Sequence, residues 1–210
     1  SIRHKGKKYT YPNGASVLGF MQDFVFRDTG LSKRVKAHSP SHPEVVYFDT
    51  QQPPCLLYEG DSALKKELRE KWGEEGDIDG FFRDMEKVIS FIQEGFKTAT
   101  PPTMESARKA LGPKLTKLWI TGSARGLVEH YFTSDRARLF FTMSASESGA
   151  VSLDSSFSAF SIPLMASGSV FDGKWGFVKG GLWTLVEDLG KINAGIGVNT
   201  ICDAKVEEVR

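Results

Sequence analysis

Two histidines, His38 and His42, have a spacing that would suit metal binding, because they stand four residues apart. On a helix, imidazoles at this spacing share one face and can bind the same metal ion. Pro40 and Pro43 prevent such a helix here, and no cysteine or carboxylate cluster accompanies the pair. We therefore expect both histidines to be solvent-exposed loop residues, and we predict no metal site.

Two serines stand in short glycine-containing segments, Ser123 in TGSARG and Ser148 in ESGA. Neither segment has the G-x-S-x-G pattern that presents a nucleophilic serine on a strained turn. We expect helix caps instead, because an N-cap hydroxyl accepts a hydrogen bond from a free backbone N–H. His130, beside Tyr131, is expected to be a partly buried structural residue. A small hydrolase built on one of these serines and a histidine is the least favoured functional hypothesis.

The segment Gly195-Ile196-Gly197 superficially resembles a dinucleotide-binding fingerprint. In such a fingerprint a strand precedes the glycines and a helix follows, so that the helix N-terminus meets the pyrophosphate. Here a predicted helix precedes them and a predicted strand follows, so we reject a phosphate loop. Asp135 and Glu187 show no carboxylate pairing that the sequence could reveal. The sequence therefore nominates no catalytic residue.

The composition is that of an ordinary globular protein. The chain has 210 residues, of which 40% are hydrophobic and 25% charged, and its formal net charge is +1. So small a net charge gives no support for a nucleic-acid partner. No run of 18 apolar residues predicts a transmembrane helix, and no leader peptide stands at the N-terminus, although peripheral contact with a membrane stays open.

Cys55 and Cys202 lie far apart and match no metal or redox spacing. We expect two buried thiols in a reducing compartment, which indicates an intracellular protein of the cytoplasm or an organelle interior. The chain begins with Ser1 rather than Met and stops on a strand-like segment at Arg210. Both ends suggest an internal piece of a longer polypeptide.

The C-terminal stretch predicts a strand, a helix and two further short strands. Apolar residues recur at three- and four-residue steps through the helix, which indicates one buried face. Gly195 and Gly197 are expected to end this helix. The face consists of Leu182, Leu185, Val186, Leu189 and Ile192. The strands are expected at Trp175–Val178, Val198–Ile201 and Val206–Val209.

Upstream, the hydrophobic periodicity predicts a β-hairpin and several helices. The hairpin strands are Val45–Phe48 and Cys55–Tyr58. The clearest helix is an apolar stripe from Ile78 to Phe96 with Asp77 as its cap, and this stripe forms either core or the wall of an apolar cavity. The fold class expected is α+β, a small mixed sheet flanked by several helices. Further helices are expected at 18–26, from 61 to about 72, at 123–132 and from 133 to about 144.

Two runs of this sequence resemble a known family. WGFVKGGLWTLVEDL…AGIGVNTICDAKVEEV is similar to the W-G-[FY]-V-x-G-G-[ML]-x-x-L…G-[VI]-x-[VI]-x-T…V-x-x-[VI] run of phytoene-desaturase-like flavoproteins, in the flavin-containing amine oxidase superfamily. LVEHYFTSDRARLFFTMSA resembles another segment of that family, with Phe132 and Ser134 at matching places. The resemblance implies an internal substrate-domain fragment: residues 1–30 adjoin the FAD domain, 31–195 form the substrate-binding domain, and 196–210 return as strands towards the FAD domain.

The resemblance also implies where FAD would be contacted. Gly14, with Gly6 and Tyr9 before it, matches the G-x-x-[YF]-x-x-G element whose backbone passes close to the flavin, although Pro12-Asn13-Gly14 can equally be a plain tight turn. The backbone of Val206 falls on the adenine-contacting strand of the family. The G-x-G-x-x-G strand–turn–helix is not in this sequence, so FAD-binding segments of the parent polypeptide would hold the cofactor.

Two main functional hypotheses follow. In the first, the chain is the substrate-binding portion of a FAD-dependent oxidoreductase that acts on a lipophilic small molecule, as the resemblance implies, and it is inactive in isolation. The apolar stripe at Ile78–Phe96 and the segment Phe157–Met165, which Pro163 can kink, would wall the cavity. In the second, the chain is a non-enzymatic α+β binding domain that has lost the flavin machinery.

Overall fold

The computed structural model describes residues 2–9, 14–15, 17–41, 44–48, 55–57, 61–147 and 151–209. Helices form most of the structure and the strands are short, which confirms the α+β class. The strands are β1 (Ile2–His4), β2 (Lys7–Tyr9), β3 (Ala37–His38), β4 (Glu44–Val46), β5 (Cys55–Leu57) and β6 (Phe177–Val178). The α-helices are α1 (Asp23–Asp28), α2 (Asp61–Glu70), α3 (Ile78–Thr98), α4 (Met104–Leu115), α5 (Ala124–Tyr131), α6 (Asp135–Glu147), α7 (Ser161–Met165) and α8 (Trp183–Gly195). Short 3₁₀ turns span Leu31–Lys33 and Ser158–Phe160, and a π-helical turn spans Thr116–Ile120.

The strands of the described residues pair two by two, so the expected mixed sheet is wrong. β1 pairs with β2, β3 with β6 and β4 with β5, each time antiparallel. The predicted hairpin is confirmed by the third pair, in which Val46 faces Cys55. Each strand has only two or three residues, so the helices pack mainly against one another instead of covering a sheet.

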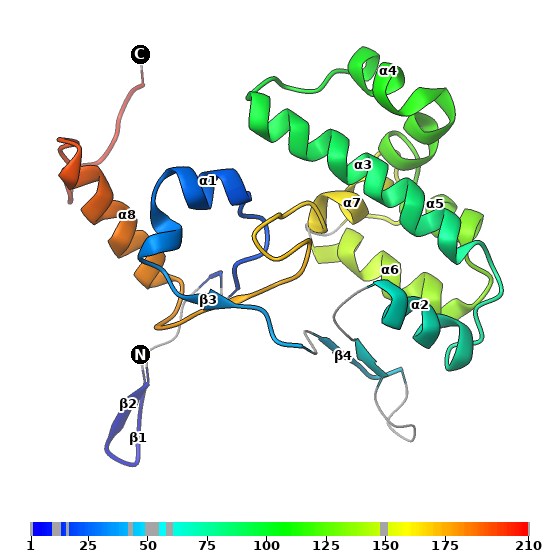
Figure 1. Ribbon diagram of the computed structural model, residues 1–210, viewed down its shortest axis with the longest axis horizontal. Helices are drawn as coiled ribbons and strands as arrows, with labels where there is room; N and C mark the ends of the chain where they lie inside the picture. Colours follow the sequence, from blue (N-terminus) through cyan, green and yellow to red (C-terminus); the bar gives the residue numbers. More distant parts are fainter. Residues whose placement is uncertain are drawn as a thin grey trace.

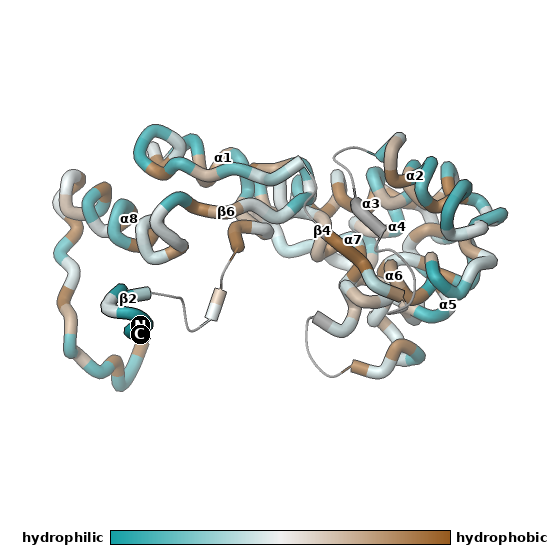
Figure 2. Tube along the Cα trace, turned by 90° about the horizontal axis from the view of Figure 1, so that it is seen from below, coloured by the Kyte–Doolittle hydropathy of each residue, from teal (hydrophilic) through white to brown (hydrophobic). Residues whose placement is uncertain are grey.

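The molecule has two lobes, which Figure 1 shows side by side. The helical lobe (described residues between 44 and 166) contains α2 to α7, and the small lobe (17–41 and 167–195) contains α1, α8 and the β3–β6 pair. Each lobe has its own cluster of buried apolar side chains. The β1–β2 hairpin and residues 196–209 extend away from the small lobe (Figures 1 and 2).

Helix α3 is the central element of the helical lobe. Its N-terminus is fixed by Asp77, whose carboxylate accepts a hydrogen bond of 2.8 Å from the backbone N–H of Gly80. It ends at Ala99, which has a left-handed φ of 51°. The cap and the apolar stripe were both predicted, although Phe96 at the end of the stripe is half exposed.

An aromatic cluster fills the core beside α3. Phe81 is fully buried, and its ring lies 4.7 Å from that of Phe132 and 4.5 Å from that of Phe141. Phe132 and Phe141 stack with their planes 2° apart. Trp119 donates its indole N–H to the Tyr131 hydroxyl at 3.1 Å. Such ring pairs stabilise a core beyond the area that they bury, so this cluster fixes how α3, α5 and α6 pack.

A buried carboxylate joins two loops of the helical lobe. Glu74, which is only 3% exposed, accepts hydrogen bonds from the N–H groups of Gly76 at 2.6 Å, Thr133 at 2.8 Å and Ser134 at 2.9 Å. The Thr133 hydroxyl donates a fourth, at 3.0 Å. Burial alone would raise the pKa of Glu74, but these hydrogen bonds together outweigh it and hold the pKa below its usual value.

The small lobe is built from segments distant in sequence. Leu18 exchanges two backbone hydrogen bonds with Gly176, and β3 pairs with β6 next to them. Helix α8 packs Leu185 into the lobe's apolar cluster, with Leu182, Leu189 and Ile192 against it, as predicted. Val186, which was expected on this face, is 50% exposed instead. The predicted end of the helix at Gly195 is confirmed.

Other expectations are wrong. Residues 198–209 contain no strand, and Val198, Ile201 and Val206 are exposed, because no other described strand pairs with them. The helix expected at 18–26 begins only at Asp23, because Leu18 is engaged in pairing with Gly176. The predicted domain boundary at residue 30 stays a prediction, although the small lobe's apolar cluster joins side chains on both of its sides.

Candidate functional site

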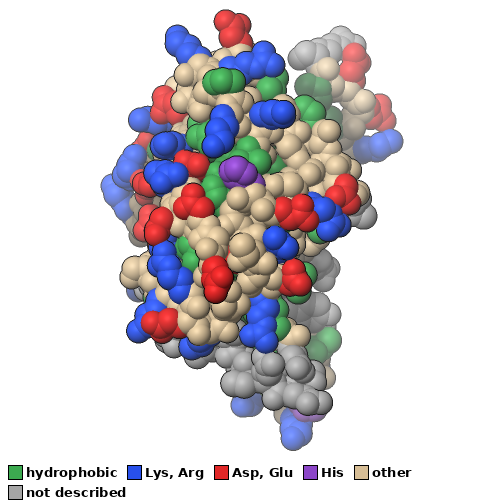
Figure 3. Space-filling model, turned by 90° about the vertical axis from the view of Figure 1, so that its right-hand side faces the viewer, with side chains coloured by type: hydrophobic (Ala, Val, Ile, Leu, Met, Phe, Trp, Pro, Cys, Tyr) green, Lys and Arg blue, Asp and Glu red, His purple; other side chains and the backbone are tan. Residues whose placement is uncertain are grey.

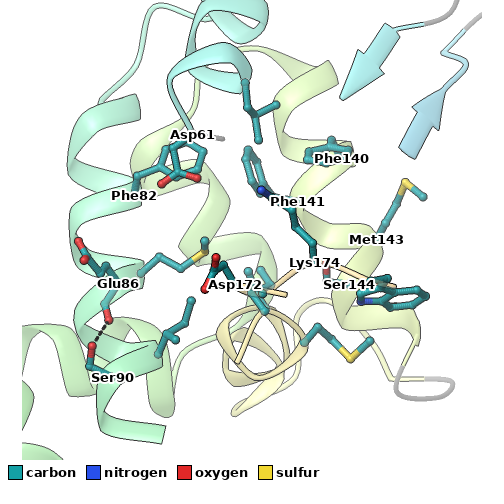
Figure 4. Close-up of a pocket in the computed structure, with 18 of the residues that line it drawn as sticks. Asp61, Phe82, Glu86, Ser90, Phe140, Phe141, Met143, Ser144, Asp172 and Lys174 are labelled. Atoms are coloured by element: carbon teal, nitrogen blue, oxygen red, sulfur yellow. Dashed lines mark hydrogen bonds between the residues drawn. The ribbon is translucent and has the colours of Figure 1, made fainter. Parts of the chain in front are cut away.

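A cavity of about 570 Å³ lies in the helical lobe, next to its junction with the small lobe. Its walls are α3 on one side and α6 with α7 on the other, and α2 and residues 172–175 border it (Figure 4). A volume of this size is typical of small-molecule sites. The lining side chains are mostly apolar: Leu64, Phe82, Met85, Ile89, Phe140, Phe141, Met143, Ile162, Met165, Ala166 and Trp175.

Helix α3 contributes to the cavity and to the core with two neighbouring faces. Phe82, Met85 and Ile89 follow one another at steps of three and four residues and line the cavity. Phe81, Val88 and Ile92 repeat on the adjacent face and are buried in the core. The apolar stripe of α3 therefore serves both as core and as cavity wall, the two roles that the sequence left open.

The segment Phe157–Met165 forms part of the wall, as expected, but only in its second half. Ile162 and Met165 line the cavity from α7, whereas Phe157 is 57% exposed. Pro163 lies in a helix of only five residues, where its missing N–H costs little because the first turn has free N–H groups in any case. Where a kinked helix was expected, the segment forms a 3₁₀ turn followed by the short helix α7.

Charged and polar side chains stand at the edge of the cavity. Figure 4 shows Glu86 and Ser90 along the α3 wall, Met143 and Ser144 on the α6 wall, and Asp172 between them. The Ser90 hydroxyl donates to the backbone carbonyl of Glu86 at 2.9 Å. Asp61 and Lys174 complete the charged part of the lining.

A second cavity, of about 640 Å³, adjoins the first between α1 and the C-terminal half of α3. It shares Ser90, Gln93 and Asp172 with the first cavity, so the two meet at these side chains. Its remaining lining is largely polar or charged: Gln22, Asp23, Phe24, Arg27, Glu94, Lys97 and Ser169.

A hydrogen bond between Gln93 of the helical lobe and Ser167 of the small lobe crosses the junction beside these cavities, and further contacts join segments of the small lobe next to it. The backbone carbonyl of Ser167 accepts from the side-chain amides of Gln22 at 3.0 Å and Gln93 at 3.1 Å. The Ser169 hydroxyl accepts from the backbone N–H of Asp23 at 2.8 Å. Gly168 packs so closely on Gly19 that a methyl group there would lie 1.7 Å from the Gly19 carbonyl oxygen. The small lobe is thus closely packed where it meets the helical lobe.

The two residues expected to contact FAD are both exposed. Gly14 has open space where a side chain would lie. Val206 is 74% exposed and lies outside any strand. Neither residue lines either cavity, and the FAD contacts stay a prediction.

The residues first considered for chemistry have structural or exposed positions. The Ser123 hydroxyl accepts from the backbone N–H of Gly126 at 3.1 Å, so it caps α5 as predicted. His38 is exposed, as expected, but it lies in β3 and not in a loop. His130 is also exposed instead of partly buried. The expectation of buried thiols is wrong for Cys202, which is exposed. His42 and Ser148, and the side chain of Cys55, lie outside what the structure describes.

The described residues contain neither a cluster of metal ligands nor a helix suited to spanning a membrane. No group of three or more His, Cys, Asp or Glu side chains converges there as a metal site would. Every helix in these ranges is too short or too polar to cross a bilayer. On the face of the helical lobe shown in Figure 3, positive and negative side chains are interspersed, so this face presents no large area of one sign.

Comparison with protein-family models, with curated proteins and with solved structures gives no match for this chain.

Proposed function

We propose that this chain is the substrate-binding portion of a FAD-dependent oxidoreductase, of the desaturase or dehydrogenase type, that acts on a lipophilic small molecule. The observation that carries the binding part of this proposal is the cavity of about 570 Å³ with mostly apolar walls. The redox part is carried by the resemblance of the 120–210 region to phytoene-desaturase-like flavoproteins. In such enzymes the flavin accepts the hydride, and the protein supplies binding, orientation and exclusion of water.

In this proposal the described chain binds the substrate and does not hold the flavin. Apolar side chains of α3, α6 and α7 remove the hydrocarbon part of the substrate from water, which is favourable in proportion to the area buried. Phe82, Phe141 and Ile162 are buried and form a fixed base for the ligand. In this proposal FAD-binding segments of the parent polypeptide hold the cofactor, and the backbones of Gly14 and Val206 contact it there.

The proposal places the parent polypeptide inside the cell and gives it no nucleic-acid partner. An exposed thiol at Cys202 persists unmodified most readily in a reducing compartment. The formal net charge of +1 provides no field that would attract a polyanion.

Two experiments test the two parts separately. For the redox part, the purified chain and the polypeptide from the complete reading frame are each mixed with FAD and desalted, and their visible absorbance is recorded. Flavin retained only by the longer polypeptide supports the proposal. If neither polypeptide retains flavin, the oxidoreductase hypothesis is refuted. The alternative, a binding domain without flavin chemistry, then remains.

For the binding part, the chain is titrated with Nile red, an uncharged lipophilic dye whose fluorescence rises in apolar surroundings. Ile89→Trp replaces an aliphatic side chain of the cavity wall by a bulky indole ring and should weaken dye binding at least about tenfold. Phe96→Trp on the same helix is the matched control, because Phe96 is half exposed and lies outside the cavity lining. Equal dye affinity in both variants would show that the dye binds elsewhere.

A further inference from the structure

We propose that the cavity takes an amphiphile, a molecule with a hydrocarbon body and a polar head group that carries no negative charge. This inference deepens the proposed function and rests on it, because it names the class of lipophilic ligand. The hydrocarbon body occupies the apolar cavity, and the head group lies where the two cavities meet at Ser90, Gln93 and Asp172.

The first argument is the change in lining along one helix. Phe82, Met85 and Ile89 of α3 give the apolar cavity aromatic and aliphatic side chains, and Glu86 stands at its edge. Ser90, which follows Ile89 directly, and Gln93, one turn further on, belong to both cavities, and Glu94 and Lys97 follow in the second. A pure hydrocarbon lying along this path would cover polar groups without hydrogen-bonding to them, which is costly. A ligand with a polar end avoids that cost.

The second argument is the kind of polar group found at the junction. The Gln93 amide nitrogen donates to the Ser167 carbonyl, which orients the side chain. Among the described residues no donor reaches its oxygen, so Gln93 Oε1 is available to accept a hydrogen bond. The Ser90 hydroxyl has already donated to the Glu86 carbonyl and can still accept. Together with the Asp172 carboxylate, the junction offers acceptors, and these suit a head group that donates.

The third argument is charge. Carboxylates outnumber cations around the two cavities: Asp23, Asp61, Glu86, Glu94 and Asp172 against Arg27, Lys97 and Lys174. Arg27 and Asp23 pair with each other at 2.7 Å, which leaves Asp61, Glu86, Glu94 and Asp172 against Lys97 and Lys174. A negatively charged head group therefore meets net repulsion, whereas a hydroxyl or ammonium group does not.

The test compares four probes built on a ten-carbon chain by displacement of Nile red, each below its micelle-forming concentration and at low salt. The probes are decanol, decyltrimethylammonium, decanoate and decyl methyl ether. We expect decanoate to bind about tenfold more weakly than decyltrimethylammonium, and this ratio to shrink at high salt. We also expect the ether to bind more weakly than decanol, although it is the more apolar, because it cannot donate a hydrogen bond.

Two variants test whether the head group binds where the two cavities meet. Asp172→Asn removes one charge and keeps a residue type that tolerates the left-handed φ of 50° at this position. It should bring decanoate closer to the other probes, whereas Glu105→Gln on α4, outside both cavities, should leave the ratios unchanged.

The possible outcomes distinguish failure of the head-group assignment from failure of the proposed lipophilic binding. Decanoate binding as tightly as decyltrimethylammonium, or the ether as tightly as decanol, overturns the head-group assignment while lipophilic binding stands. Failure of all four probes to displace the dye overturns lipophilic binding itself, and the amphiphile with it.

Discussion

Replacing Glu74 by glutamine should destabilise the protein by about 2–4 kcal/mol at neutral pH. One oxygen of the carboxylate accepts from Gly76 and twice from Thr133, and the other accepts from Ser134 at 2.9 Å. A glutamine amide has only one acceptor oxygen, so its NH₂ group must face at least one of these donors. One buried N–H then loses its partner, and the remaining hydrogen bonds lose the contribution of the negative charge.

The effect of this change on pH dependence has a definite sign. The folded-state pKa of Glu74 lies below its ordinary value of 4.5, so the carboxylate stabilises the fold above that pH. This contribution is lost as the pH falls below 4.5 through the folded-state pKa. The difference in unfolding free energy between wild type and Glu74→Gln should therefore be constant above about pH 5.5 and shrink as the solution becomes more acidic.

Urea unfolding followed by circular dichroism, from pH 7 down to pH 3.5, measures this difference. Glu75→Gln is the matched control, since Glu75 is the exposed neighbour and its variant should stay within about 0.5 kcal/mol of wild type. The reasoning is refuted if Glu74→Gln unfolds at the wild-type urea concentration at pH 7. It is equally refuted if the difference grows as the pH falls.

Three further changes have direct readouts. Phe81→Ala removes the ring at the centre of the aromatic cluster and should lower the unfolding free energy by about 3–5 kcal/mol in urea, whereas a loss below 1 kcal/mol would mean that the cluster does not hold the core. Gly168→Ala should speed hydrogen exchange in the small lobe because its methyl group meets the Gly19 carbonyl, and Gly190→Ala in α8, where there is open space, should not. Cys202 should react with a thiol reagent in the native protein, and a rate as slow as that of a buried thiol would contradict its exposure.

Helices with strong local signals were predicted well from the sequence. The boundaries of α3 and α5 depend on Asp77 and Ser123 as caps and on apolar residues within a few turns, all of which are local in sequence. Strand formation depends on a partner as well as on residue type. Val198–Ile201 has strand-forming residues, but no other described segment pairs with it, and the prediction failed there.

The cavity could be anticipated only in part, for the same physical reason. The apolar stripe of α3 indicated a cavity wall as one of two roles, but which residues face the cavity depends on how α6 and α7 pack against it. The polar second cavity was missed, because it exists only where α1 lies against α3, more than sixty residues later in the chain. Glu74 was missed as well, since its partners Thr133 and Ser134 are 59 and 60 residues away.

The central claim, that the cavity binds a lipophilic molecule, is tested most directly by the methionine methyl groups. The chain has five methionines, and Met85, Met143 and Met165 line the cavity, whereas Met104 begins α4 outside it. In a ¹³C-methyl-methionine NMR titration with decanol, the three cavity signals should shift together and saturate, and the Met104 signal should stay in place. Shifts of equal size at Met104, or no saturable shift at the three cavity methionines, would contradict the account.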